Sequence, residues 1–272
     1  MQNEHKLPLS VLIITKNEEK NLPDCLKSVS FADEIIVLDD ESTDKTCEIA
    51  KSIGARVVQR KMDCEGRHRN YGYSLAKNQW VLSLDADERI TQELKTEIHN
   101  LFNSGNLNDY VGYDIPRRNY LGDKWLKHGG QYPSAQVRLF QKGKFEYYEL
   151  EEVHPLPKPS GPFKTLKNDI IHYSYKDVSD WFNRINRHTS LEAKKWYREK
   201  RRPRLYRKLR KTIDRFFKAL IIRKGYKDGF EGLLMAVGSG LYQLIAYAKY
   251  RELLRQNDTN KPAHVRTNNS HY

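Results

Sequence analysis

The stretch that decides the fold is residues 80–90, Trp-Val-Leu-Ser-Leu-Asp-Ala-Asp-Glu-Arg-Ile. Its apolar first half, residues 80–84, is typical of a buried strand, and two carboxylates, Asp85 and Asp87, follow at once. They therefore stand at the carboxyl end of a strand, the edge of an open α/β sheet where ligands bind. Two carboxylates this close repel each other unless a cation lies between them, so the pair indicates a divalent metal shared with a phosphate ligand. The alternative is a turn that caps the next helix.

The first hundred residues alternate between two patterns. Short apolar runs rich in β-branched residues predict strands, and apolar residues three or four apart predict helices. The expected strands are 9–14, 34–38, 56–59 and 80–84, and the expected helices are 21–30, 42–53, 67–77 and 92–102. This alternation predicts an α/β fold with a doubly wound, mostly parallel sheet. After Tyr110 the pattern becomes alternating, which predicts that the sheet is mixed.

Polar side chains follow three of these strands, at residues 15–18, 39–40 and 85–87. The carboxyl ends of parallel strands meet at one edge of a sheet, so these groups are expected to converge on one ligand. The sequence holds neither a Gly-X-Gly-X-X-Gly segment after the first strand nor a Gly-Lys-Ser/Thr phosphate loop. This argues against a dinucleotide oxidoreductase and a P-loop enzyme. A nucleotide held by acids and a metal fits better.

The net charge of the 272-residue chain is +13, which suggests nucleic-acid binding until the charge is located. Residues 200–224 hold twelve Lys and Arg against one acid, Asp214, a net charge of +11 that leaves only +2 for all other residues. The basicity is thus a local feature. Three cysteines at spacings that match no metal motif are expected to be thiols, and the first residues hold no apolar leader, so we expect a cytoplasmic protein.

Three segments carry a resemblance to a known family. They are Thr-Lys-Asn-Glu-Glu at 15–19, Val-Leu-Asp-Asp-Glu-Ser-Thr-Asp-Lys-Thr at 37–46 and Leu-Ser-Leu-Asp-Ala-Asp-Glu-Arg at 82–89. Together they resemble the family 2 inverting glycosyltransferases, whose GT-A fold is a Rossmann-like, mostly parallel mixed sheet flanked by helices. Gln-Val-Arg-Leu-Phe at 136–140 and Ile-His-Tyr-Ser-Tyr at 171–175 are similar to the branch of bacterial lipopolysaccharide core β-glucosyltransferases. The resemblance runs from about residue 8 to about residue 252.

The resemblance implies a nucleotide site at the polar edge. Thr15, Asn17 and Glu18 would line the nucleoside pocket, and Asp40 would accept a hydrogen bond from uracil N3–H. A turn residue is the alternative interpretation of Asn17.

The resemblance also implies a diphosphate and metal site. Arg67 or Arg69 would face the diphosphate, and Asp85 would lie near the ribose and the metal. Asp87 would ligate Mg²⁺ or Mn²⁺ bridging the two phosphates, where the ion offsets charge on the departing UDP. A solvated helix face is the alternative for the two arginines.

An inverting transferase needs one base to deprotonate the acceptor hydroxyl. The candidates are Glu152, then Glu151 and Glu149, all just before His154. In the family a Glu commonly follows that histidine, whereas this chain has Pro155. His154 and His172 could equally be structural histidines with satisfied hydrogen bonds.

Residues 204–223 predict an amphipathic helix, because apolar residues recur three and four positions apart and cations fill the remaining surface. The apolar residues are Leu205, Tyr206, Leu209, Ile213, Phe216, Phe217, Leu220 and Ile221, and the cations are Arg207, Lys208, Arg210, Lys211, Arg215 and Lys218. This pattern is typical of a helix in a membrane interface with its cations toward anionic head groups. The alternative is a helix packed on the catalytic domain. Residues 233–248 are apolar but too short to span a bilayer.

The predicted layout is a GT-A catalytic domain at 1–175, with a nucleotide-binding half at 8–105 and an acceptor half at 106–175. A helical membrane-associating region at 176–255 and a flexible tail at 256–272 follow. The predicted function is metal-dependent, inverting transfer of a hexose, glucose favoured, from a UDP-sugar to a lipooligosaccharide or lipopolysaccharide core acceptor at the inner face of the cell membrane. A polyprenyl-phosphate glycosyltransferase is the alternative. A nucleic-acid-binding protein is a more distant alternative function. No nucleic-acid partner is expected, because the basic residues at 200–224 lie outside the edge of the sheet where the polar strand ends meet.

Overall fold

The structure is a computed structural model that describes residues 6–148 and 156–259. The chain divides into two compact units, residues 1–176 and 177–272, each with its own buried cluster of side chains. The boundary predicted between the catalytic domain and the helical region, at residues 175–176, is one residue from this division. The three cysteines are free thiols.

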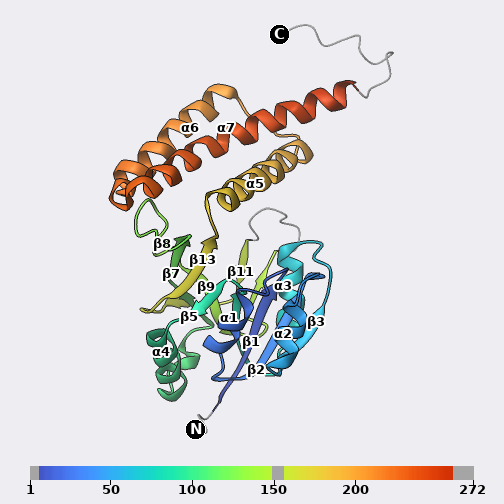
Figure 1. The fold of residues 1–272 in the computed structure, drawn as a ribbon, viewed down its shortest axis with the longest axis vertical. Coiled ribbons are helices and arrows are strands. Elements are labelled where there is room, and N and C mark those ends of the chain that lie inside the picture. Colours follow the sequence, from blue (N-terminus) through green and yellow to red (C-terminus); the bar gives the residue numbers. More distant parts are fainter. Residues whose placement is uncertain (1–5, 149–155, 260–272) are drawn as a thin grey trace. The chain divides into compact units, whose positions relative to one another are not determined.

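Unit 1 is built on a seven-stranded sheet in the order β12-β6-β9-β4-β1-β2-β3 (Figure 1). The strands are β1 (Leu7–Thr15), β2 (Ala32–Asp39), β3 (Arg56–Gln59), β4 (Trp80–Asp85), β6 (Gly112–Ile115), β9 (Gln136–Gln141) and β12 (Phe163–Thr165). Strands β1 to β4 run parallel to one another, whereas β9 runs antiparallel to both β4 and β6. The predicted mostly parallel, mixed sheet is confirmed.

Helices cover both faces of this sheet, because alternate residues of each strand point to opposite sides. Val11 and Ile13 of β1 belong to the cluster that also takes in residues of α1 (Leu22–Ser28), α2 (Thr46–Ser52) and α4 (Gln92–Asn103). Leu12 belongs to the opposite cluster, with Tyr73 of α3 (Glu65–Ser74). A Cβ at Gly72 would lie 2.5 Å from a Leu12 methyl, so the close packing of α3 on β1 requires glycine there.

The helix ends follow local capping chemistry. Thr91 caps α4 by accepting a hydrogen bond from the Leu94 N–H at 3.1 Å. Asn21 precedes α1 but makes no capping bond, and its amide donates to Glu18 instead. Helix α2 begins later than predicted, at Thr46, because the Asp44 carboxylate holds the Thr46 N–H at 3.0 Å and forms a turn.

A second, four-stranded sheet in the order β5-β13-β7-β8 begins directly after the acidic turn, and three of its strands come from the segment predicted to be the acceptor half. Its strands are β5 (Glu88–Ile90), β7 (Arg117–Leu121), β8 (Lys124–Trp125) and β13 (Ile170–Tyr175). Strand β5 starts directly after Asp87, and β13 pairs with it antiparallel. A short turn of 3-10 helix, η1 (Leu107–Asp109), and a two-stranded pair, β10 (Phe145–Tyr147) with β11 (Pro157–Pro159), complete the described part of unit 1.

Unit 2 is helical. It contains α5 (Val178–Arg198), α6 (Leu205–Phe217), a π-helical turn η2 (Lys218–Ile222), a 3-10 turn η3 (Gly225–Asp228) and α7 (Gly229–Thr259). Trp196 of α5 packs against Tyr250 of α7 in its core. No helix in the described ranges is long and apolar enough to cross a membrane. Because α7 continues to Thr259, the tail predicted to begin at residue 256 starts inside a helix, and residues 260–272 lie outside the description.

The structure corrects the predicted orientation of two side chains on α6. Lys208 does not project with the other cations, because its Nζ lies 3.6 Å from the ring centroid of Trp196 and donates to Gln243 Oε1 at 3.0 Å. Burial lowers the pKa of Lys208 to about 8. Phe216, predicted to face the membrane, is half-buried, and a Cβ at Gly240 of α7 would lie 3.3 Å from the Phe216 Cβ.

Candidate functional site

The polar ends of three strands lie side by side at one edge of the main sheet. In the parallel ladders Thr15 is opposite Asp39, and Ile14 is opposite Asp85. The Asp40 N–H donates to the Thr15 carbonyl at 2.9 Å, which ties the first two strand ends together just beyond the ladder. The predicted convergence of the three polar segments therefore occurs.

Asp85 is clamped by two arginines. Its Oδ1 accepts from Arg69 at 2.8 Å and its Oδ2 accepts from Arg138 at 2.8 Å. Burial acts to raise the pKa of Asp85, but the two guanidinium groups hold that pKa well below its usual range. Asp85 is thus a carboxylate that the two arginines keep ionised at neutral pH and hold in one orientation.

A buried acid, Glu88, binds Arg138, one of the two arginines that hold Asp85. Glu88 is fully buried and accepts from Arg138 at 2.6 Å and from the Asp85 N–H at 3.0 Å. Arg117 adds a longer contact to Glu88 at 3.4 Å. Arg138 is itself only 1% exposed, although it comes from the middle of an apolar strand. A cation in such a run was the signal for this residue, and its role was not predicted.

Asp87 faces a histidine from the second sheet. Asp87 is 9% exposed, and its Oδ2 lies 3.7 Å from His172 Nε2. Antiparallel pairing of β5 with β13 sets His172 opposite Glu88, the residue after Asp87. A separation of 3.7 Å is too long for a hydrogen bond. The structure therefore brings together a carboxylate and an imidazole, two side chains of kinds that bind metal ions, without a hydrogen bond between them.

The hydrogen bonds around His172 fix which ring nitrogen carries the proton. The Asn119 amide nitrogen donates to the Gln131 carbonyl at 2.6 Å, so its oxygen, Oδ1, is turned toward His172 Nδ1 at 2.8 Å. An amide oxygen can only accept, so Nδ1 is the donor, and in the neutral ring Nε2 carries the lone pair. A histidine that donates its other N–H to an oxygen acceptor in this way is the usual form of a metal ligand.

The donor set fits a divalent ion shared with phosphate. Twice a metal–ligand distance of about 2.1 Å exceeds the gap between Asp87 Oδ2 and His172 Nε2, so one ion can contact both. Within residues 6–148 and 156–259, no cluster of three or more His, Cys, Asp or Glu could hold a metal alone. Mg²⁺ and similar ions commonly take one or two protein ligands and complete their shell with substrate phosphates and water.

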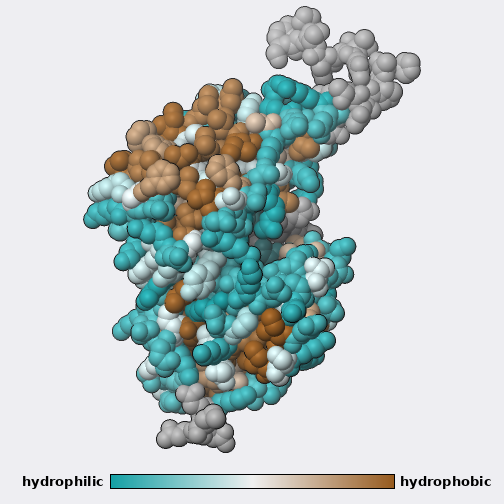
Figure 2. Space-filling view, in the orientation of Figure 1, coloured by the Kyte–Doolittle hydropathy of each residue, from teal (hydrophilic) through white to brown (hydrophobic). Residues whose placement is uncertain are grey.

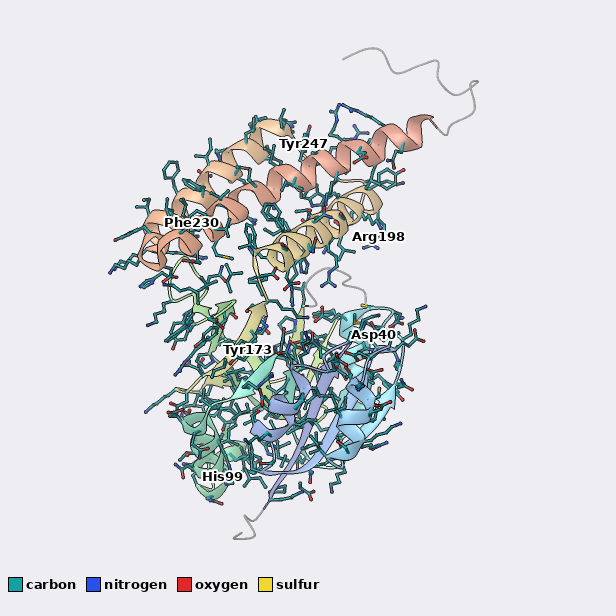
Figure 3. All side chains as sticks on the ribbon, viewed as in Figure 1. Asp40, His99, Tyr173, Arg198, Phe230 and Tyr247 are labelled. Atoms are coloured by element: carbon teal, nitrogen blue, oxygen red, sulfur yellow. The ribbon has the colours of Figure 1, made fainter. Side chains whose placement is uncertain are left out.

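At the other end of the edge, Asp40 is held in place. Its Oδ2 accepts from Lys16 at 2.8 Å, and its Oδ1 accepts from the Met62 N–H at 2.7 Å. Burial acts to raise the pKa of Asp40, but these hydrogen bonds lower it below its ordinary value. The Asp40 side chain, at the end of β2 (Figure 3), is 7% exposed, whereas the Lys16 side chain is 56% exposed.

Thr15, Asn17 and Glu18 divide into two groups. The Thr15 hydroxyl is buried, and no group in the described parts of the chain hydrogen-bonds to it. Asn17 has φ of 54° and its side-chain oxygen accepts from the Thr43 N–H at 2.8 Å, so it joins the loops after β1 and β2. The Glu18 carboxylate accepts from the Asn21 amide at 2.7 Å. The Thr15 hydroxyl thus differs from the Asn17 and Glu18 side chains, which bond within the loops, and the nucleoside-binding role of all three stays a prediction.

The two candidate arginines differ. Arg67 is 44% exposed and forms an ion pair at 2.6 Å with Asp63, four residues earlier in the chain. Arg69 is buried and binds Glu65 through Nε at 3.0 Å as well as Asp85, while its NH1 group has no hydrogen-bond partner among the described residues. Of the two arginines, Arg69 is the one that contacts Asp85 at the carboxyl end of β4.

A cavity of about 320 Å³ opens beside Arg69 in unit 1. Its lining comes from α3, β6, β9, β10, β11 and the segments next to them: Glu65, Arg69, Asp114, Ala135, Gln136, Val137, Phe145, Tyr147 and Pro157. Burial raises the pKa of Asp114, a carboxylate that sequence analysis missed. A lone acid in the apolar run 111–115 was the signal that could have found it. Glu149, Glu151, Glu152 and His154 lie outside the described residues.

This chain is similar in sequence to known glycosyltransferases. The chain is 31% identical over 257 residues to an uncharacterized glycosyltransferase of Rickettsia typhi, covering 90% of this chain and 87% of that protein. It is 27% identical over 251 residues to the lipopolysaccharide core biosynthesis glycosyltransferase LpsC of Rhizobium meliloti, covering 90% and 92%. Among solved structures, residues 1–349 of Staphylococcus aureus TarS align with 14% identity and a TM-score of 0.47, covering 94% of this chain and 93% of that one.

The family follows from the match to a family model. The model of glycosyl transferase family 2 matches residues 10–172, which is more than half of the chain and spans all the strand ends described above. The resemblance seen in the sequence motifs is confirmed, and the α/β sheet with its helical extension is the GT-A type fold that the resemblance implied. This protein is a glycosyltransferase and belongs to glycosyl transferase family 2.

Proposed function

We propose that this glycosyltransferase moves a hexose, glucose favoured, from a UDP-sugar to a lipooligosaccharide or lipopolysaccharide core acceptor, with inversion and with Mg²⁺ or Mn²⁺. The observation that carries the proposal is the pair of Asp87 and His172, with oxygen and nitrogen 3.7 Å apart at the edge where Asp85 is held ionised. The similarity to LpsC, named for lipopolysaccharide core biosynthesis, supports the acceptor class.

The donor would bind along the strand edge. The buried Thr15 hydroxyl and the Asp40 carboxylate are available at the nucleoside end, where Lys16 would move aside for uracil N3–H to reach Asp40. Arg69 would face the diphosphate with its NH1 group, which has no partner in the described ranges. Asp85 would orient the ribose, because both of its oxygens are fixed by arginines.

Asp87 and His172 would hold the divalent ion, which supplies positive charge that offsets the charge developing on the departing UDP. Asn119 and Ser174 contribute by holding the His172 ring, with contacts of 2.8 and 2.9 Å to Nδ1. The fixed ring would keep Nε2 directed toward the Asp87 carboxylate.

The acceptor would enter through the cavity beside Arg69, which lies at the same edge and is large enough for one sugar ring. Glu152, with Glu151 as the alternative, is the proposed base that takes the proton from the attacking hydroxyl. Asp114 is a further carboxylate in the cavity lining, and its raised pKa suits a group that hydrogen-bonds a sugar hydroxyl.

Thermal unfolding with a panel of nucleotide sugars tests the donor. At 100 times its dissociation constant, a ligand stabilises by about 2.7 kcal/mol, or roughly 5 °C or more for a domain of this size. We expect this shift from UDP-glucose with Mn²⁺, and expect Asp87→Asn to lose the Mn²⁺-dependent part. Stabilisation by GDP- or CDP-sugars in place of UDP-sugars would contradict the proposed donor.

Product analysis tests the acceptor. With purified inner-core lipooligosaccharide, we expect a mass increase of one hexose on the saccharide, with a β linkage. A product that instead appears on polyprenyl phosphate would replace the proposed acceptor by the alternative one and leave the donor assignment intact.

A further inference from the structure

Helix α6 has two stripes of side chains with different surroundings. The first, Lys208, Thr212 and Phe216, faces α7: the Lys208 ammonium binds Gln243, and a Cβ at Gly240 would lie 2.9 Å from the Thr212 carbonyl oxygen. This contact positions α6 within unit 2. The stripe that packs within unit 2 therefore includes Lys208, Thr212 and Phe216.

The second stripe has no covering element within the described part of unit 2. Tyr206, Leu209, Ile213 and Phe217 recur at spacings of three, four and four, and each is 44% to 59% exposed. Residues in such a register share one side of a helix. A soluble helix normally buries its apolar stripe, so this second one indicates a binding surface.

Helix α7 adds a matching stripe from its first half. Phe230, Leu233, Val237 and Leu241 again recur at three, four and four, and Phe230 is 71% exposed at the start of the helix (Figure 3). Ile222, in the turn between the helices, is 72% exposed. Hydrophobic residues gather over α6 and the first half of α7 in the space-filling view (Figure 2). We call this two-helix surface the apolar face.

Cations accompany the apolar face. Of the twelve Lys and Arg in residues 200–224, eleven are exposed, and Lys208 is the exception. Arg207, Arg210 and Lys211 lie on α6 in the same turns as Leu209 and Ile213. A surface of exposed large apolar side chains next to dense positive charge fits a partner that is apolar inside and anionic at its boundary.

We infer that the apolar face docks on the surface of an anionic lipid bilayer, with its apolar side chains among the acyl chains and the flanking cations at the head groups. A second copy of this chain fits poorly, because dimerisation would bring two segments of charge +11 together. Nucleic acid fits poorly too, because phosphates attract the cations but leave Ile213, Phe217 and Phe230 in water. This inference concerns binding and stands independently of the proposed donor and acceptor.

Vesicle co-sedimentation of the full chain tests the inference. We expect binding to vesicles of equal parts phosphatidylglycerol and phosphatidylcholine, little binding to phosphatidylcholine alone, and weakening as NaCl rises from about 50 to about 500 mM. Each cation near an anionic surface contributes roughly fivefold in affinity, so Arg207→Glu, Arg210→Glu and Lys211→Glu together should weaken binding by roughly 100-fold or more at low salt.

Matched variants distinguish membrane binding through the apolar face from nonspecific adsorption of the protein to vesicles. Ile213→Asn, Phe217→Asn and Phe230→Asn together should abolish sedimentation, whereas Phe182→Asn, an exposed aromatic of α5, should not. The charge control is Arg187→Glu, Lys194→Glu and Arg198→Glu, also on α5, which should retain most of the binding. Variants are compared only after circular dichroism shows wild-type melting.

Three outcomes would overturn the inference. They are equal loss in the α5 controls, vesicle binding that ignores lipid charge and salt, and concentration-dependent dimers that disappear in the Ile213→Asn, Phe217→Asn, Phe230→Asn variant. Tight binding to a random DNA duplex that competes with vesicles and survives the apolar substitutions would assign the surface to nucleic acid instead.

Discussion

The two units of this chain use charge in opposite ways. In unit 1, Asp85, Glu88 and Arg138 are joined by contacts of 2.6 to 2.8 Å, and Arg138 is almost completely buried. In unit 2, eleven of the twelve cations in residues 200–224 are exposed beside exposed apolar side chains. Buried, paired charge fixes the position of atoms and is weakly screened, whereas exposed charge attracts over several ångströms and is screened by salt.

Substitutions in the two units should therefore have different kinds of effect. Changes at the buried edge of unit 1 should alter chemistry or stability and be insensitive to ionic strength. Changes on the exposed surface of unit 2 should alter where the protein is found, and their effects should fade in high salt. The predictions below test this division, beginning with the largest expected effect.

Asp87→Ala should abolish transfer, a loss of about three orders of magnitude or more, because the remaining His172 cannot hold the ion in place alone. The measurement is UDP release with Mn²⁺ at low and high salt, and the loss should be the same in both. The matched control is Asp63→Ala, whose carboxylate pairs with exposed Arg67. Full activity of the wild type in chelator would refute the metal role of Asp87.

Glu152→Gln should lower kcat by roughly two to four orders of magnitude and leave donor binding unchanged, because it removes the base but keeps the shape of the side chain. Asp114→Asn, in the cavity lining, should affect mainly the KM for acceptor. The two variants are compared by steady-state kinetics with both substrates varied. If Asp114→Asn lost as much kcat as expected for Glu152→Gln while Glu152→Gln remained active, the base would be Asp114.

Arg138→Met should destabilise unit 1 by about 3–5 kcal/mol, because Asp85 and the fully buried Glu88 lose their shared counter-ion. Arg67→Met, which removes an exposed ion pair, should change the free energy of unfolding by less than about 1 kcal/mol. Urea unfolding measures both. Similar small losses would mean that the buried network contributes little to the stability of unit 1.

The contrast also explains what the sequence could predict. The strands of unit 1 follow from apolar runs, and the edge follows from acids at their ends, since both signals lie within a few consecutive residues. The expected strand at 56–59 coincides with β3, and the strand beginning at Trp80 is β4. Local patterns are sufficient where the structure is set by neighbours in the chain.

Long-range pairings were not predictable in the same way. The position of His172 beside Asp87 depends on β13 pairing with β5, eighty or so residues earlier in the chain. On α6, periodicity identified an amphipathic helix but could not tell which stripe packs on α7. Lys208 was grouped with the exposed cations for that reason, although Trp196 and Gln243 enclose it.

Lys208 provides the test with the smallest expected effect. It is the one cation of residues 200–224 that is not exposed, so its titration should differ from that of the others. Its pKa in the folded protein is about 8, below the ordinary value for lysine, so between pH 8 and about 10.5 the unfolded chain binds more protons than the folded one. The desolvation penalty is fully present below pH 8 and is relieved as pH rises through this window.

The free energy of unfolding of the wild type, minus that of Lys208→Met, should accordingly increase from pH 7.5 to pH 10, because other titrating groups cancel in the difference. Urea unfolding at both pH values measures it. Lys211→Met, which removes an exposed cation from the same helix, should show no such slope. If the difference in free energy of unfolding did not change with pH for either variant, Lys208 would titrate as an exposed lysine. Its assignment as the packed cation of α6 would then be wrong.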